Sequence, residues 1–191
     1  MVTVALPRQP ARARLLRAAD ALFYERGIAA TGVDAVIERA GVATGSLYKN
    51  FSGKDELVAA YLDDRDRRWR DEWESAIAAA ADPVARVLAI FTATERWRDD
   101  VGLGRGCAHI AAANQLPSDH PGMAVAVAHK RHVVERLTEL VAAADIPEPA
   151  GAARDIALIY DGMLGSMAVG LDPDAINRAR RITYTLLNGG R

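Results

Sequence analysis

Residues 31–51 read TGVDAVIERAGVATGSLYKNF, and this stretch decides the fold of the N-terminal part of the chain. Thr31 is a residue type that caps helices, so it predicts the start of a short helix. Gly41 predicts the end of that helix, because glycine readily adopts the left-handed backbone that follows many helices. Thr44 predicts the cap of a second short helix, which ends near residue 50. Two short helices joined by a tight turn predict a helix-turn-helix unit.

The second short helix carries different residue types on its two sides. Leu47 and Phe51 are four residues apart, so we expect both to pack inward. The outward positions are small or polar, namely Thr44, Gly45, Ser46, Lys49 and Asn50. Such a helix suits the major groove of duplex DNA, where each base pair presents its own pattern of donors and acceptors.

Helical periodicity continues on both sides of this unit. The preceding helix has its apolar face at Leu15, Ala18, Ala19, Leu22 and Phe23, and Gly27 predicts its end. Ser52 predicts the cap of a long fourth helix. The buried side of that helix is marked by Leu57, Tyr61, Trp69, Trp73 and Ile77.

Charge is distributed unevenly along a chain whose net charge is -1. Residues 1–54 contain eight Lys or Arg against four acids, whereas residues 55–191 contain sixteen against twenty-one. The first part therefore carries +4 and the second -5. A basic head on an acidic body is typical of a protein that binds a polyanion through its head.

The remainder of the chain also has a helical pattern. Half of its 191 residues are hydrophobic and only 6% are aromatic, which favours packed helices over sheets. Asp82 and Pro83 predict the start of a fifth helix, and a glycine-rich break follows at Gly102, Gly104 and Gly106. Further helices are expected at about residues 107–116, 122–144, 152–169 and 173–187, the last capped by Asp172.

We therefore predict an all-α fold of about nine helices. Residues 1–54 are expected to form a helix-turn-helix DNA-binding domain with three helices. Residues 55–191 are expected to form a helical domain for ligand binding and dimerisation.

Several classes of protein are excluded by composition. Cys107 is the only cysteine, which excludes an intrachain disulfide and any multi-cysteine metal site. No apolar run approaches the roughly 20 residues of a membrane span. The N-terminus lacks the continuous apolar segment of a signal peptide. We expect a cytoplasmic protein without a membrane partner.

We expect no catalytic site, no metal site and no cofactor. The four histidines are His109, His120, His129 and His132, and no pair has the spacing of a helical zinc protease. His129 and His132 are three residues apart and could share a metal, but no nearby carboxylate pair completes a site. The sequence lacks a serine elbow, a phosphate-binding loop and a dinucleotide fingerprint.

The stretch from Arg14 to Leu57 resembles the DNA-binding region of the tetracycline-repressor (TetR) family. The residues that carry the resemblance are Ala18, Ala19, Leu22, Phe23, Gly27, Thr31, Val33, Ala40, Gly41, Val42, Gly45, Ser46, Leu47, Tyr48, Phe51, Lys54 and Leu57. The chain departs from the family pattern at Ala43, where serine is common, and at Asn50, where histidine is frequent.

The resemblance implies DNA-binding roles position by position. Thr31 would cap the second helix and touch a phosphate. Tyr48 and Lys54 would contact phosphates, Lys54 together with backbone N–H groups at the start of the fourth helix. Gly45 would permit a close approach of the backbone. The residues that would reach bases or nearby phosphates are Thr44, Ser46, Lys49 and Asn50.

Other interpretations of these residues stay open. Tyr48 could instead be a half-buried core residue, and Lys54 an ordinary solvated lysine. Arg8 and Arg12 lie on an N-terminal arm that either reaches phosphates and the minor groove or is merely disordered.

The family resemblance also implies a body that binds a small molecule and forms a dimer. Candidate ligand-binding residues are Phe91, Trp97, Cys107, His109, Ile110, Asn114, Met123, Val127, Tyr160, Met163 and Met167. Each could equally be a core residue. Cys107 is also a candidate redox sensor, although a lone cysteine in apolar surroundings is commonly inert.

The last two helices are predicted to form the dimer interface. Small residues among apolar ones permit close packing of two helices from each subunit. The expected interface residues are Ile156, Ile159, Met163, Ser166, Met167, Ile176, Ala179, Thr183 and Leu187. The eighth helix could instead be internal core.

The sequence thus predicts a homodimeric repressor that a small hydrophobic or amphipathic ligand releases from a palindromic operator in double-stranded DNA. A DNA-binding activator or architectural protein without an effector is one alternative. A small helical metal-dependent enzyme is another.

Overall fold

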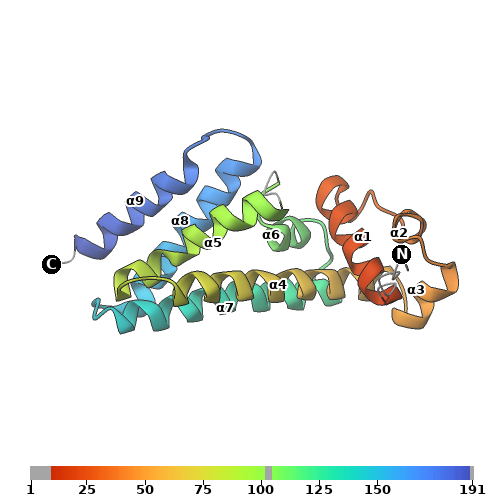
Figure 1. Cartoon of the computed structure of the whole chain (residues 1–191), viewed down its shortest axis with the longest axis horizontal. Coiled ribbons are helices and arrows are strands. Elements are labelled where there is room, and N and C mark those ends of the chain that lie inside the picture. Colours follow the sequence, from red (N-terminus) through yellow and green to blue (C-terminus); the bar gives the residue numbers. More distant parts are fainter. Residues whose placement is uncertain (1–9, 102–104, 190–191) are drawn as a thin grey trace, which may run out of the picture.

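The computed structural model describes residues 10–101 and 105–189, and these residues form nine helices with no strand (Figure 1). The helices are α1 (Ala11–Arg26), α2 (Val33–Ala40), α3 (Thr44–Asn50), α4 (Lys54–Ala78), α5 (Pro83–Val101), α6 (Ala108–Ala113), α7 (Pro121–Ala143), α8 (Pro149–Ala168) and α9 (Ala175–Asn188). The predicted all-α fold is confirmed.

The helices α1, α2 and α3 gather at one end of the molecule (Figure 1). Their apolar residues form one core with side chains from two helices of the body. Leu57 and Leu62 of α4 belong to this core, and so do Ala108 and Ala112 of α6. The DNA-binding region is therefore seated directly on the first two turns of α4 and on α6.

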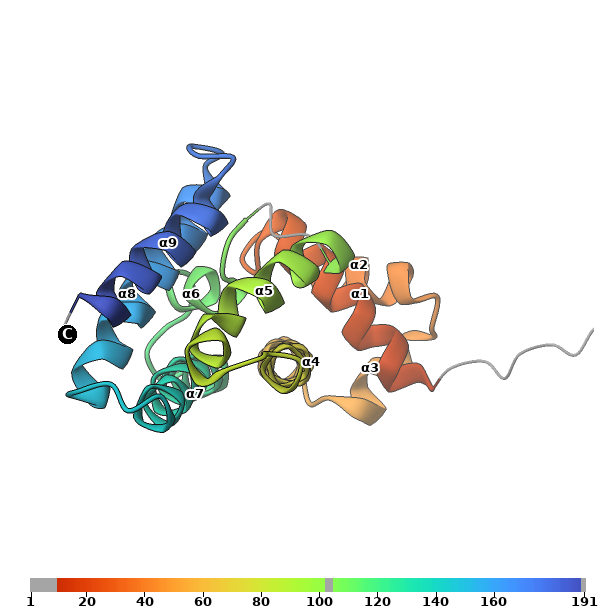
Figure 2. The same ribbon diagram turned by 60° about the vertical axis from the view of Figure 1, so that its left-hand side comes forward.

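The two long helices α4 and α7 lie against each other and form the base of the body (Figure 1). Figure 2 views α4 nearly along its axis, with α7 on one side of it and α1 on the other. The helices α5, α8 and α9 cover this base. These five helices share a second core, whose largest fully buried side chains are Trp73, Ile90, Phe91, Leu137 and Ile156.

Several predicted helix boundaries are confirmed by local contacts. Asp82 Oδ1 accepts a hydrogen bond from the Ala85 N–H at 2.7 Å, and Pro83 is the first residue of α5. Gly41 ends α2 in the left-handed conformation, with φ 58°. The last helix begins at Ala175 rather than Pro173, because Asp172 accepts from the Asp174 N–H and closes a turn before the helix starts.

Within the described ranges, no helix is both long and apolar enough to cross a membrane.

Candidate functional site

The turn between α2 and α3 is held in place by α1. Arg14 Nη2 donates a hydrogen bond to the Gly41 carbonyl at 2.6 Å. A Cβ at Gly41 would lie 2.8 Å from that same nitrogen, and the left-handed backbone already disfavours other residues. The angle between α2 and α3 therefore depends on a glycine and on an arginine from a third helix.

The outer face of α3 is open to solvent. Tyr48 is 58% exposed, and Thr44, Gly45 and Lys49 are exposed as well. Leu47 and Phe51 are buried, as predicted from their spacing. The interpretation of Tyr48 as a core residue is therefore wrong.

Two polar residues of α3 are less exposed to solvent than Lys49. Ser46 and Asn50 are partly buried, and Asn50 Nδ2 donates to the Ser46 carbonyl at 2.7 Å. Contact between Asn50 and a base therefore requires this bond within the helix to be exchanged for one to DNA.

The predicted role of Thr31 is corrected by the structure. Thr31 is only 2% exposed, and its hydroxyl donates to the Gly27 carbonyl at 2.8 Å. The residue that caps α2 is Gly32, and no side chain accepts a cap hydrogen bond there. Thr31 thus closes the end of α1, and its buried hydroxyl cannot reach a phosphate.

Two further predictions around α3 change in detail, whereas Lys54 lies at the start of α4 as predicted. Thr44 is the first residue of α3 rather than its cap, which is Ala43. Ser52 does not cap α4. Instead the Ser52 N–H donates a hydrogen bond to Glu56 Oε2 at 2.7 Å. This hydrogen bond lowers the pKa of Glu56, and burial has little effect on it. Lys54 is partly buried and is the first residue of α4.

The predicted N-terminal arm is also shorter than expected. Arg12 lies within α1, and its guanidinium lies 5.4 Å from the centre of the Phe51 ring. Arg8 lies outside the described residues.

Buried charges join the DNA-binding region to the body. Asp20 of α1 accepts from Arg65 Nη1 and from Arg68 Nη2 of α4, each at 2.6 Å. Arg65 is only 4% exposed and lies over the Tyr24 ring, 4.3 Å from its centre. Removing one partner of such a pair leaves a buried charge uncompensated, so α1 and α4 are strongly held together.

A groove of about 670 Å³ lies between α6 and α7. Its walls are mostly apolar and include three predicted ligand-binding residues, His109, Ile110 and Val127. Lys130 and Glu135 of α7 place charges at the same groove.

A second, much smaller cavity of about 40 Å³ lies among α4, α5, α6, α7 and α8. Four predicted ligand-binding residues line it, namely Trp97, Cys107, His109 and Tyr160. The sequence interpretation missed the other six residues of its wall, among them Arg65, Trp69 and His129. Nothing in their local spacing indicates that they meet residues from α6 and α8.

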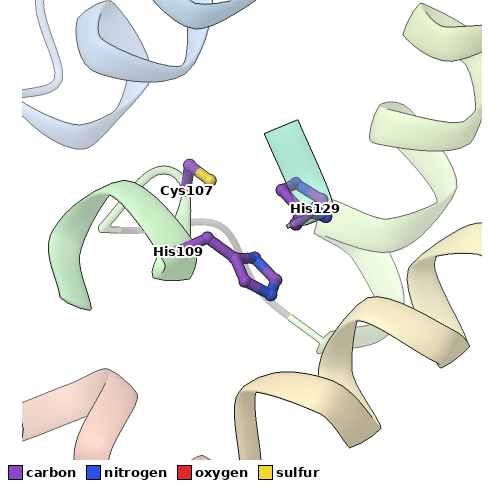
Figure 3. A group of neighbouring side chains, drawn as sticks. All are labelled: Cys107, His109 and His129. Atoms are coloured by element: carbon purple, nitrogen blue, oxygen red, sulfur yellow. The ribbon is translucent and has the colours of Figure 1, made fainter. Parts of the chain in front are cut away.

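Cys107, His109 and His129 form a polar cluster at this cavity (Figure 3). Their ligand atoms lie within 4.8 Å of one another. The two imidazole rings are stacked, with centres 3.9 Å apart and planes 9° apart. His129, from α7, faces Cys107 and His109 at the start of α6 (Figure 3).

Outer contacts fix both histidines of the cluster. His109 Nε2 lies 3.1 Å from the Leu62 carbonyl, and His129 Nδ1 lies 2.6 Å from Asp66 Oδ1. Burial alone would raise the pKa of Asp66, but hydrogen bonds from His129 and Arg70 outweigh it and lower that pKa to about 2. Likewise, burial raises the pKa of Cys107, and hydrogen bonds with both histidines bring it well below its usual value.

Residues 15–61 match the sequence profile described as "Bacterial regulatory proteins, tetR family". The fold extends the likeness to the whole chain. A crystal structure of a TetR-family transcriptional regulator from Streptomyces coelicolor is 31% identical, with a TM-score of 0.85 over 94% of this chain and 95% of that one.

This chain belongs to the TetR family of transcriptional regulators. The family assignment confirms the predicted DNA-binding regulator rather than an enzyme.

Two characterised relatives of this TetR-family chain act in opposite senses. The HTH-type transcriptional repressor KstR2 of Mycobacterium tuberculosis is 39% identical over 87 residues, which are 44% of this chain and 42% of the relative. The HTH-type transcriptional activator FasR of Mycolicibacterium smegmatis is 47% identical over 57 residues, 30% of this chain and 26% of the relative. The chain thus matches less than half the length of either relative.

The remaining ligand candidates do not line the groove or the small cavity. Phe91 and Met163 are buried in the core of the body, and Asn114 is exposed. Met123 and Met167 are partly buried and lie outside both linings. Phe91 and Met163 belong to the core of this TetR-family body, and Met167 packs against it.

Most of the predicted dimer residues on α8 and α9 face the core of their own chain rather than its surface. Most of them are buried in the core of their own chain, namely Ile156, Met163, Ile176, Ala179, Thr183 and Leu187. Ile159, Ser166 and Met167 are partly buried. The outer faces instead present Leu158, which is 72% exposed, and Ile182, which is 48% exposed. An apolar helix face packs on its own body first, and sequence alone does not show which face that is.

Proposed function

We propose that this TetR-family chain is a homodimeric repressor that binds a palindromic operator and leaves it when an apolar or amphipathic small molecule binds. The observation that carries the DNA-binding part is the open face of α3, whose exposed residues have no packing role within the chain. Operator binding takes place where the chromosome lies, so we place the protein in the cytoplasm.

The residues of α3 and its surroundings divide into two groups. Lys49 and Thr44 are exposed on the outer face. We propose that they reach base edges, together with their neighbours Gly45 and Ser46. Tyr48 and Lys54 are proposed to contact phosphates. Phosphate contacts set the position of the protein on DNA, whereas base contacts set the preferred sequence.

A dimer is proposed because one α3 helix covers too few base pairs for specificity. Two-fold symmetry doubles the contacts and sets half-sites one or more helical turns apart, roughly 34–36 Å per turn. The exposed residues Leu158, Ile182 and Leu186 give α8 and α9 an apolar outer surface. Gly162 and Gly165 of α8 have open space at the Cβ position, so a partner helix could approach closely there.

The α6–α7 groove is proposed as the effector site. Its volume of about 670 Å³ lies within the range of small-molecule sites, roughly 300–1,000 Å³, whereas the 40 Å³ cavity does not. The groove wall includes His109, whose ring bonds to the Leu62 carbonyl of α4. Leu62 belongs to the core of the DNA-binding region. An effector that displaces α6 therefore acts on that core.

The operator proposal is tested by selecting bound duplexes from a random DNA pool. We expect the selected sites to share a dyad, and their affinity to fall as salt rises, because Lys and Arg release counterions from DNA. Selected sites without a dyad would contradict the dimeric mode. A reporter gene placed under the selected site distinguishes repression from activation.

The dimer surface is tested by the double substitution Leu158→Glu and Ile182→Glu. We expect a folded monomer by sedimentation, with operator affinity reduced at least tenfold, because four buried carboxylates oppose association. The control is Val127→Glu, a half-exposed residue of α7, which should stay dimeric. An unchanged dimer in the double variant would place the interface elsewhere.

The effector proposal is tested by screening amphipathic compounds by thermal shift and then measuring each affinity with and without operator. Coupling is reciprocal, so operator must weaken effector binding by the same factor, typically 5–150-fold. Val127→Arg should weaken effector binding at least tenfold by placing a bulky charged side chain on the apolar groove wall, while operator binding stays intact. A compound that binds the protein equally well with and without operator is not the effector.

A further inference from the structure

We propose that Cys107, His109 and His129 form a binding site for one thiophilic divalent transition-metal ion, for which Zn²⁺ is the probe. One thiolate and two imidazoles are a common protein ligand set for zinc. The three ligand atoms lie within 4.8 Å of one another. Around a tetrahedral zinc ion they would lie about 3.5 Å apart, given Zn–S of about 2.3 Å and Zn–N of about 2.0 Å. Binding therefore requires an inward movement of about 1 Å and a turn of the stacked rings.

The outer hydrogen bonds leave one nitrogen of each histidine for the ion. The Leu62 carbonyl can only accept, so His109 Nε2 carries the hydrogen and Nδ1 keeps its lone pair. The ionised Asp66 carboxylate likewise accepts from His129 Nδ1, which leaves Nε2. A carbonyl or carboxylate behind each ligating histidine is the usual outer arrangement of metal sites, because it orients the ring and increases its basicity.

The small cavity beside the cluster suits an ion better than an organic molecule. Its volume of about 40 Å³ holds an ion and a water or two, on the scale of about 10–15 Å³ per water. Three protein ligands leave the fourth position of a tetrahedral ion open, here toward the cavity. Arg65 and Trp69 belong to the cavity wall, and their Nη2 and Nε1 atoms are buried without a hydrogen-bond partner among the described residues. Both are donors, so a water, hydroxide or small anion on the ion would satisfy them.

The site would join three helices. Cys107 and His109 lie at the start of α6, His129 lies on α7, and Asp66 and Leu62 lie on α4. The helix α6 also supplies Ala108 and Ala112 to the core of the DNA-binding region. A bound ion would thus connect α6, which supports the DNA-binding region, to α4 and α7. This site does not depend on the proposed operator or effector.

The experiment is a titration of the full-length reduced chain with Co²⁺, followed by displacement with Zn²⁺. We expect one ion per chain, a thiolate-to-cobalt charge-transfer band in the near ultraviolet, and intense visible bands of tetrahedral cobalt. Zn²⁺ should remove both sets of bands. A folded chain without the charge-transfer band would overturn the proposal, whatever its variants do.

Variants show which residues bind the ion. Cys107→Ser should abolish the charge-transfer band, and His109→Gln and His129→Gln should each weaken Zn²⁺ binding at least tenfold. Asp66→Asn should weaken it about 10–100-fold, as loss of an outer partner does. Circular dichroism checks that each variant is folded, and Cys107→Ala replaces Cys107→Ser if the latter unfolds.

His132→Gln is the matched control. His132 lies one turn beyond His129 on α7, but its ring faces Trp73, 6.3 Å away, and not the cluster. We expect its Zn²⁺ affinity to equal that of the unaltered chain. If Cys107→Ser and the unaltered chain had equal affinities for Zn²⁺, the ion would bind elsewhere on the protein and the proposed site would be overturned.

Discussion

The DNA-binding region and the body organise their functional residues in opposite ways. The proposed DNA contacts apart from Lys54 lie within the seven residues of α3, and all belong to one exposed face or its edge. The groove and the small cavity instead collect residues from α4 to α8, many of them buried. The DNA contacts come from one continuous segment, so their spacing can be read along the sequence. The pocket residues come from several helices, so their spacing along the chain does not show that they meet. The first can therefore be recognised in a sequence, and the second only in part.

The two regions meet at Asp20, where the largest effect of a single substitution is expected. Asp20→Ala should lower the free energy of unfolding by about 3–5 kcal/mol, because Arg65 is then left as a buried, unpaired charge. Chemical denaturation measures this loss. Asp63→Ala is the control, since Asp63 pairs with Arg67 at the exposed surface and should change stability little. Equal losses in both variants would mean that the two regions are not held together by this pair.

Within the DNA-binding region, the inner side of α3 should matter for stability and the outer side for DNA. Leu47→Ala removes a fully buried side chain and should cost about 2–5 kcal/mol of stability. Ser46→Ala, one position earlier on the same helix, should cost at most about 0.5 kcal/mol. Thermal or chemical unfolding compares the two. A small loss for Leu47→Ala would mean that α3 is not anchored by its inner side.

On the outer side, we expect Lys49 and Lys54 to contribute differently. Lys49→Ala should change the preferred operator and cost about 1–3 kcal/mol on the original one, as loss of a base contact does. Lys54→Ala should weaken all duplexes alike and lower the salt slope by about 1. Binding to the selected operator and to two altered operators, each at several salt concentrations, separates these outcomes. Sequence-independent losses from both variants would remove the base-reading role of Lys49.

The smallest effect is expected at the Tyr48 hydroxyl. Tyr48→Phe should weaken operator binding by about 0.5–1.5 kcal/mol without changing the preferred sequence, because one hydrogen bond to phosphate is lost. Stability should be unchanged, since the side chain is exposed. A changed sequence preference would instead place the hydroxyl at a base edge.

Much of the fold was predictable because its signals are local. Periodic apolar residues marked the buried side of α4, and Gly41 and Pro83 marked helix ends through backbone preferences that need no tertiary partner. The prediction that Thr31 caps α2 was wrong, because a threonine hydroxyl can form hydrogen bonds in either direction along the chain. A threonine hydroxyl can accept from a following N–H or donate to a preceding carbonyl, and here the Gly27 carbonyl takes it.

The candidate site of the body was only partly predictable. Cys107 and His109 stood out as chemical groups, but His129 lies twenty residues further along the chain and was paired in the sequence with the wrong histidine. The same limit applied to the dimer surface. Both faces of α8 carry apolar residues, so Ile156 and Leu158 were indistinguishable until the packing of α8 on its own chain was known.

The helices, the helix-turn-helix unit and the family resemblance could be predicted from the sequence, because they follow from periodicity and backbone preference along a continuous segment. Three other features depend on how the helices pack together: which apolar face of α8 and α9 is buried, which residues line the cavity, and the meeting of Cys107, His109 and His129. The physical reason is that a helix fixes the relative positions of residues three or four apart, while contacts between helices depend on how the whole core packs.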